Sequence, residues 1–172
     1  FINMLSWAYN TLMNDGRSLS DLKQGVTLEV FGEGTSPGPS GNIEDNSYVS
    51  FGEAMQTLED NGVSTNIASY LGATTVRIQE IGYANRKATD EEMESMRNIV
   101  KLAMEQGAIG IGSSLIYAPA DYADTNELIE LSKVASAYGG RYISHIRNED
   151  SRILSAVDEL IEIAEQANIP AE

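Results

Sequence analysis

The sequence contains no cysteine, which excludes a disulfide framework, a thiolate metal site and a cysteine nucleophile. Basic residues are also scarce: 11 Lys and Arg stand against 26 Asp and Glu, so the formal net charge is −15. Such a chain repels phosphate backbones and anionic lipids. We therefore expect it to bind neither nucleic acid nor a membrane surface.

Long apolar runs are missing as well. No segment approaches the ~18 consecutive apolar residues that a membrane-spanning helix needs, and no signal-peptide pattern opens the chain. These observations leave the compartment open between cytoplasm and periplasm. The 172 residues, 42% of them hydrophobic, suffice for one domain with a sizeable core. The chain begins with Phe1 rather than Met, and a further apolar strand begins at Ile169, just before the last residue. We therefore expect a piece truncated at both ends.

Helix signals alternate with β-rich runs along the chain. Capping boxes and acidic caps indicate four helix starts, at Ser50 with Glu53, Thr89 with Glu92, Asp124, and Asp150. Residues that tolerate a left-handed backbone indicate the helix ends, at Gly25, Gly62, Gly107, Gly139 and Asn168. A candidate strand follows each end, and one opens the chain: residues 1–5, 26–31, 63–70, 108–116, 141–146, and a strand beginning at Ile169.

This alternation predicts an α/β fold with a parallel sheet. An open doubly wound sheet and a (β/α)8 barrel share the pattern, and five or six units fall short of the roughly 250 residues of a full barrel. Both folds place functional residues at the carboxyl ends of strands and in the following loops. The loops of interest are residues 32–49, 78–88, 117–123 and 147–149.

The only histidine, His145, lies at the end of a predicted strand. An imidazole there can ligate a metal or transfer protons. The structural alternative is a partly buried histidine whose nitrogens are satisfied by the backbone. Arg147 and Glu149 follow closely and either orient and charge-balance His145 or form an ordinary exposed ion pair.

Glu33 follows another predicted strand and lies between Gly32 and Gly34. The glycines let the backbone bend, so this carboxylate can reach a metal. The alternative is a solvated loop glutamate.

Residues 110–119 combine small side chains with a tyrosine, Tyr117, before Ala118 and Pro119. The small residues allow either close backbone packing or the approach of a substrate. The Tyr117 hydroxyl can bond a substrate carboxylate or carbonyl. The segment is not a phosphate loop, because the lysine of a Walker motif is missing.

Three segments together resemble the N-acyl-D-amino-acid deacylase (D-aminoacylase) branch of the metal-dependent amidohydrolases. They are residues 24–30 (Gln-Gly-Val-Thr-Leu-Glu-Val), residues 110–119 with Ser-Leu-Ile-Tyr-Ala-Pro, and residues 139–147 with Ser-His-Ile-Arg. The Ser-His-Ile-Arg-Asn-Glu run is the most specific match, and the likeness extends along nearly the whole chain.

The resemblance implies a (β/α)8 TIM barrel that hydrolyses an amide bond with a metal, usually zinc, which polarises the carbonyl and activates water. Residues 1–172 would then be a partial amidohydrolase barrel domain, roughly the first five to six βα units. His145 would be the metal-binding histidine of the fifth strand, and Tyr117 would contact substrate. The catalytic aspartate would lie beyond Glu172, so no catalytic residue is expected within these residues.

The sequence departs from the family pattern at two places. Where the family has His-x-His after the first strand, this chain has Leu5-Ser6-Trp7, so two metal ligands are lost. The family's metal-binding cysteine aligns with Glu33, and a carboxylate is a competent zinc ligand. We therefore expect one zinc ion per chain, held by Glu33, His145 and a further histidine past Glu172. Residues 1–172 alone are expected to be inactive.

Three functions fit these residues. The leading one is deacylation of a small N-acyl (D-)amino acid or a related linear amide by metal-activated water. The second is hydrolysis of a cyclic amide, as in hydantoinase- or dihydroorotase-like enzymes. The third is a non-catalytic paralogue that binds small molecules after losing the first-strand His-x-His. The oligomeric state stays open.

Overall fold

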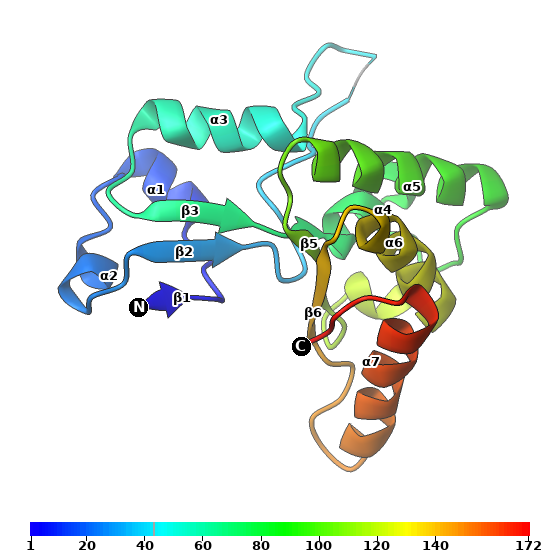
Figure 1. The fold of residues 1–172 in the computed structure, drawn as a ribbon. Helices are drawn as coiled ribbons and strands as arrows, with labels where there is room; N and C mark the ends of the chain where they lie inside the picture. Colours follow the sequence, from blue (N-terminus) through cyan, green and yellow to red (C-terminus); the bar gives the residue numbers. More distant parts are fainter. Residues whose placement is uncertain (43) are drawn as a thin grey trace.

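The computed structural model describes residues 1–42 and 44–172 and shows an α/β architecture with parallel strands (Figure 1). Residue 43, inside the predicted loop 32–49, lies outside the described residues. The strands are β1 (Ile2–Asn3), β2 (Leu28–Phe31), β3 (Asn66–Ser69), β4 (Leu71–Gly72), β5 (Gly110–Ser114) and β6 (Arg141–His145). The helices are α1 (Tyr9–Asn14), α2 (Leu19–Lys23), α3 (Phe51–Asn61), α4 (Ala73–Ile81), α5 (Asp90–Glu105), α6 (Thr125–Ala137) and α7 (Ile153–Ala167), with a 3-10 turn at Ala120–Tyr122.

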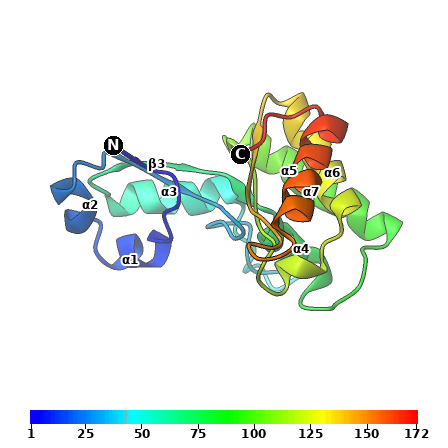
Figure 2. The same cartoon turned by 90° about the horizontal axis from the view of Figure 1, so that it is seen from below.

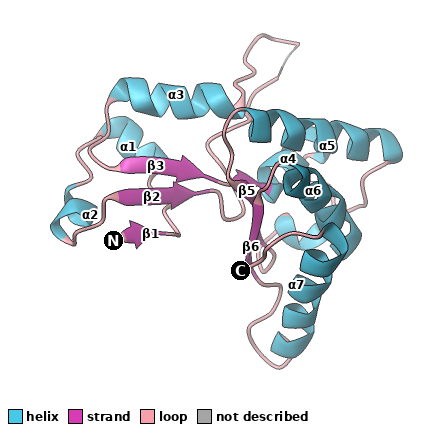
Figure 3. Cartoon of the chain, in the orientation of Figure 1, coloured by secondary structure: helices cyan, strands magenta, loops and turns pink. Residues whose placement is uncertain are grey.

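The strands form two three-stranded parallel sheets, β1-β2-β3 and β4-β5-β6 (Figure 3). Only Tyr70 separates β3 from β4, so the predicted strand 63–70 contains β3 of the first sheet and ends just before β4 of the second. The end of the chain pairs with β6, because Tyr142 N donates to Pro170 O at 2.9 Å. Parallel pairing in chain order confirms the α/β prediction, but the described residues do not close into a barrel.

Each sheet has its own helices and its own core. Helices α1, α2 and α3 accompany the first sheet, while α4 to α7 gather around the second (Figure 2). Leu12, Phe31 and Leu58 form the small core of the first half. The larger cluster extends from α3 through β4, β5 and β6 to Ile169. Among the described residues, no helix is long and apolar enough to cross a membrane.

Three of the four helix starts that the sequence marks are present, and one is wrong. Both capping boxes are present, and the Asp124 side chain accepts from Glu127 N. The prediction of an Asp150 cap is wrong, because α7 begins two residues later and Arg152 is its N-cap. The side chain of Asn148 accepts from Asp150 N and Arg152 N at 3.1 Å, which stabilises a turn ahead of the helix. All five predicted stops have positive φ angles, from 50° at Asn168 to 101° at Gly107.

Helix α4 is not predicted by the sequence pattern, so the loop expected at residues 78–88 begins only at Gly82. A backbone N–H in the first turn of α4 finds its partner outside the helix, because Thr74 N donates to Gly34 O at 3.0 Å. The helix buries Thr74, Thr75 and Arg77 beside its apolar residues. Its inward face is therefore not an apolar stripe, and helical periodicity cannot reveal it.

The apolar faces of α5 and α7 differ in how far they are buried. Met96, Val100 and Ala103 of α5 are buried, so this face of the helix fills the larger core. Helix α7 instead buries its small-residue face with Ile163 and leaves other apolar residues, Leu154 and Ile161 among them, exposed.

A backbone contact joins the two sheets. A Cβ at Gly112 of β5 would lie 2.1 Å from Gly32 O and 3.1 Å from Glu33 Cα, at the end of β2. Gly32 itself has a φ of +100° and approaches Tyr70 O, so it too admits no side chain. The glycines of the 110–119 segment thus serve close backbone packing, one of the two readings that the sequence left open.

A fully buried carboxylate ties the first sheet to its loops. Glu29 of β2 accepts hydrogen bonds from the hydroxyls of Ser6 (2.7 Å), Ser18 (2.5 Å) and Thr65 (3.0 Å). These donors come from the segments that follow β1, precede α2 and precede β3. Three hydroxyl donors compensate the desolvation of the carboxylate without an ion pair.

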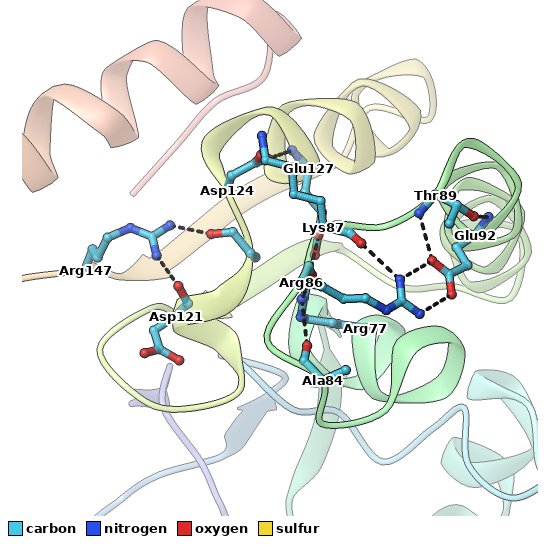
Figure 4. Close-up of polar contacts among 11 residues, drawn as sticks. Arg77, Ala84, Arg86, Lys87, Thr89, Glu92, Asp121, Asp124, Glu127 and Arg147 are labelled. Carbon is cyan, nitrogen blue, oxygen red and sulfur yellow. Dashed lines mark hydrogen bonds and ion pairs between the residues drawn. The ribbon is translucent and has the colours of Figure 1, made fainter.

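A buried ion pair ties the second half together. Arg77 of α4 and Glu127 of α6 meet with an Nη1 to Oε2 distance of 2.5 Å, and both side chains are buried. Arg77 Nη2 also donates to the carbonyls of Ala84 and Arg86, in the loop after α4 (Figure 4). Burial raises the pKa of the Glu127 carboxyl, while Arg77 opposes that rise.

Substituting Glu127→Ala should destabilise the protein by about 3–5 kcal/mol, because it leaves the Arg77 guanidinium buried without its counter-ion. Urea unfolding of the full-length protein measures the effect. The matched control is Glu94→Ala, which breaks the exposed pair with Arg97 on α5 and should cost less than about 1 kcal/mol. Equal shifts in the two variants would refute the assignment.

Substituting Gly112→Ala should destabilise the protein by about 1–3 kcal/mol, because the new methyl overlaps the carbonyl of Gly32. Thermal unfolding provides the measurement. The control is Gly52→Ala in α3, whose methyl would meet only the flexible side chain of Gln106 at 3.2 Å. A Gly112→Ala variant as stable as the control would contradict the close contact.

Candidate metal and substrate site

Glu33 follows the carboxyl end of β2, as the sequence predicts. Its two flanking glycines have φ angles of +100° and +92°, so the backbone bends here in a way that most residues cannot follow. The turn packs on β5, where a Cβ at Gly34 would lie 2.7 Å from Ser114 Cβ. Partial burial raises the pKa of the Glu33 carboxyl, and the electrostatic influence of His145 lowers it. Ser114 also pairs in register with His145, so Glu33 and His145 lie in neighbouring segments at this edge.

His145 is the last residue of β6 and lies at the same edge of the structure. Its Nε2 atom is buried and has no hydrogen-bond partner among the described residues. Glu149 Oε1 lies 3.2 Å from Nε2, but the geometry is not that of a hydrogen bond. A buried nitrogen without a donor or acceptor is costly, so its orphan state favours a ligand.

Tyr117 lies against His145. Their ring centroids are 5.4 Å apart with an interplanar angle of 75°, an edge-to-face arrangement. The tyrosine side chain is 59% exposed, so its hydroxyl is accessible beside the imidazole. The fold therefore brings Glu33, His145 and Tyr117 together from three separate segments.

Arg147 has other partners. Its guanidinium forms two hydrogen bonds of 2.9 Å with the carboxylate of Glu159 on α7. It also donates to the carbonyls of Asp121 and Ala123, and Figure 4 shows Arg147 beside Asp121. The side chain thus connects α7 to the segment after β5. Of the two residues expected beside His145, only Glu149 contacts it.

The residues present fit part of a zinc site. A carboxylate and an imidazole are both zinc ligands, and His145 Nε2 is the orphaned nitrogen that such a site needs. Within residues 1–42 and 44–172, however, no group of three or more His, Asp or Glu side chains is placed to hold a metal ion. Glu33 and His145 would therefore supply two ligands of a larger set.

Two further residues at this edge are not identified as site residues by the sequence. Ser114 is buried, and its hydroxyl has no hydrogen-bond partner in the described part of the chain. It pairs in register with His145, so the two side chains lie on the same face of the sheet. Trp7 lies in the segment where the family has His-x-His, and it lines a pocket together with Ser114 and Tyr117. The period-two alternation of β5 and β6 could have predicted Ser114.

No protein-family model matches the chain. Its curated relatives, however, are all deacylases of N-acyl-D-amino acids. The chain is 32% identical over 149 residues to a D-aminoacylase of Alcaligenes xylosoxydans xylosoxydans, covering 85% of this chain and 31% of the relative. It is 28% identical over 120 residues to the N-acyl-D-aspartate deacylase of the same organism, covering 69% of this chain and 24% of the relative.

Solved structures of the same kind share the fold. A D-aminoacylase studied for its binuclear metal centre superposes with a TM-score of 0.87 at 26% identity. The N-acyl-D-glutamate deacylase of Bordetella bronchiseptica, solved with zinc and a phosphonate inhibitor, has a TM-score of 0.89 at 23% identity and supports the fold alone. Both matches cover 99% of this chain and 39% of the solved chain.

The chain thus spans about a third of the length of the relatives that it matches. Similarity in sequence to D-aminoacylase and N-acyl-D-aspartate deacylase agrees with similarity in fold over nearly all the residues of this chain. The chain is a homologue of the N-acyl-D-amino-acid deacylases, the D-aminoacylase-like branch of the amidohydrolases.

Proposed function

We propose that this chain is part of a metal-dependent hydrolase that removes the acyl group from an N-acyl (D-)amino acid. The observation that carries the proposal is the orphaned, buried Nε2 of His145 on a strand whose neighbour, at Ser114, packs against the turn that holds Glu33. Its relatives, D-aminoacylase and N-acyl-D-aspartate deacylase, supply the reaction class.

We propose that residues 1–172 are the first five to six βα units of a (β/α)8 barrel domain truncated at both ends. Parallel strands that follow one another in chain order support this assignment, since a barrel grows in that way. The uncovered apolar residues of α7, including Leu154 and Ile161, support it too, because the next barrel unit would pack there.

Glu33 and His145 would hold zinc, with a further histidine expected past Glu172. When bound, the metal lowers the pKa of a water molecule and polarises the scissile carbonyl. A single ion is proposed, because Leu5 and Trp7 stand where the family has two histidines. The solved D-aminoacylase with a binuclear centre is activated by one metal and attenuated by the second, which supports a site that works with one ion.

The other site residues have distinct proposed roles. The Tyr117 hydroxyl binds the carbonyl or carboxylate of the substrate beside His145. Glu149 orients the His145 imidazole, from which it lies 3.2 Å away. Arg147 positions the segment that leads from Tyr117 to α6, because it bonds the carbonyls of Asp121 and Ala123. The proton-relaying aspartate is expected past Glu172.

Elemental analysis of the purified full-length protein should find about one zinc ion per chain. The variants Glu33→Ala and His145→Ala should each lose it, because each removes one ligand. Glu94→Ala, an exposed carboxylate on α5, should retain the metal. Zinc that persists in both ligand variants would refute the proposed site.

Metal content and substrate turnover of the same full-length protein distinguish the alternative functions. A protein that binds acyl compounds without metal or turnover would be the non-catalytic paralogue. Turnover of hydantoins or dihydroorotate in preference to N-acyl-D-amino acids would identify the cyclic-amide hydrolase.

Substituting Tyr117→Phe should raise KM for N-acetyl-D-amino acids by roughly 10-fold, because a hydrogen bond to a charged or polar group of the substrate is worth about 1.5 kcal/mol. The ring and its contact with His145 remain in this variant. Tyr138→Phe, which removes an exposed hydroxyl bonded to Glu105, serves as the control. An unchanged KM in Tyr117→Phe would exclude the hydroxyl from substrate binding.

A further inference from the structure

A pocket of about 310 Å³ opens beside the proposed metal ligands. Three residues of the pocket lie next to the proposed ligands Glu33 and His145. Gly34 follows Glu33 in the chain, Tyr117 contacts the His145 ring, and Ser114 pairs in register with His145. A group of the substrate that enters this pocket therefore lies next to Glu33 and His145. The volume is at the lower end of the range typical of small-molecule sites.

Ser114 gives the pocket a polar point. The residue is only 5% exposed, and its hydroxyl has no hydrogen-bond partner in the described structure. A buried hydroxyl left without a partner costs free energy, so a ligand atom that bonds to it is favoured. Ser113, its neighbour in β5, contrasts with it, because its hydroxyl bonds both Tyr142 and Ser144.

The walls of the pocket are aromatic and unusually exposed. Trp7 is 60% exposed, Tyr83 74% and Tyr117 59%, and they come from the loops after β1, α4 and β5. Ile78 and Pro119 add apolar surface between them. Large apolar side chains that converge on one hollow from separate segments mark a binding surface.

The pocket is also uncharged. The chain carries a net charge of −15, yet no Asp, Glu, Lys or Arg is among the described residues that line this hollow. An acidic group placed here would lose water without gaining a cation, at a cost that disfavours binding. The pocket therefore discriminates against charged groups and in favour of apolar ones.

We propose that this pocket is the subsite that selects an uncharged, apolar substituent of the substrate, with Trp7, Tyr83 and Ile78 as its walls and the Ser114 hydroxyl as its hydrogen-bonding point. The inference rests on the proposed function and deepens it by naming the substrate class. The substituent is either the acyl group or the amino-acid side chain, since both adjoin the scissile amide.

Two substrate series on the full-length protein distinguish these sources. In the first, D-alanine carries acetyl, butanoyl or phenylacetyl groups. In the second, the acetyl group is constant and the amino acid is D-alanine, D-leucine, D-phenylalanine or D-aspartate. The phenyl-bearing member should be preferred over the smallest by about 10-fold or more in kcat/KM in one series, because apolar pockets discriminate at that scale.

Tyr83→Ala and Trp7→Ala should abolish that preference, while Tyr138→Ala, an exposed tyrosine on another face, should leave it intact. Tyr83→Arg should shift preference toward D-aspartate, or toward a succinyl group in the acyl series, because it supplies the missing cation. A profile that none of the pocket variants changes would overturn the proposal.

Binding without turnover gives an independent readout. Trp7 is the only tryptophan of residues 1–172, and the difference in emission between the full-length protein and its Trp7→Phe variant reports occupation of the pocket. Phenylacetate or D-phenylalanine should change the emission saturably, acetate and D-aspartate should not, and Trp7→Phe should remove the change. Such a response in a protein that hydrolyses nothing would support the pocket and refute the proposed function. Hydrolysis with no response and no change of profile would refute the pocket alone.

Discussion

The backbone contact between the turn after β2 and strand β5 is the constraint on which the rest of the structure depends. Gly32 and Gly112 approach so closely that neither position has space for a methyl group. Helix α3 also joins the two halves, because its Leu58 belongs to the smaller core and its Phe51 to the larger one. Glu33 comes from one half and His145 from the other. Glycine at both positions permits the close packing that brings these two segments to one edge.

Polar side chains that hold the fold together differ from those at the candidate site in whether their hydrogen bonds are satisfied. Glu29 has three hydroxyl donors, and Arg147 has four hydrogen bonds, so these buried or half-buried groups are fully occupied by the fold. Of the four buried side-chain polar atoms without a partner in the described part of the chain, two belong to Ser114 and His145 at the same edge. Because native proteins rarely leave such atoms unpaired, their convergence favours a site that binds a ligand.

Local signals in the sequence predict most of the secondary structure and the position of two candidate site residues. Capping boxes, glycine stops and strand ends depend on residues a few positions apart, and they place Glu33 and His145 at strand ends correctly. Features that depend on distant partners are not predictable in this way. Helix α4 buries Arg77 only because Glu127 lies 50 residues away. The pairing of Arg147 with Glu159, rather than with its neighbours, likewise arises from the packing of α7.

The same buried arginine has a consequence for how the chain can change. Arg77 holds the loop after α4 through the carbonyl oxygens of Ala84 and Arg86, and Tyr83 of this loop forms a wall of the pocket. Backbone carbonyls are identical in every residue, so the anchor is indifferent to the side chains that the loop carries. Residue 83 can therefore be exchanged while the loop keeps its course. Homologues built on this frame can change a wall of the pocket by surface substitutions that leave the folding core untouched.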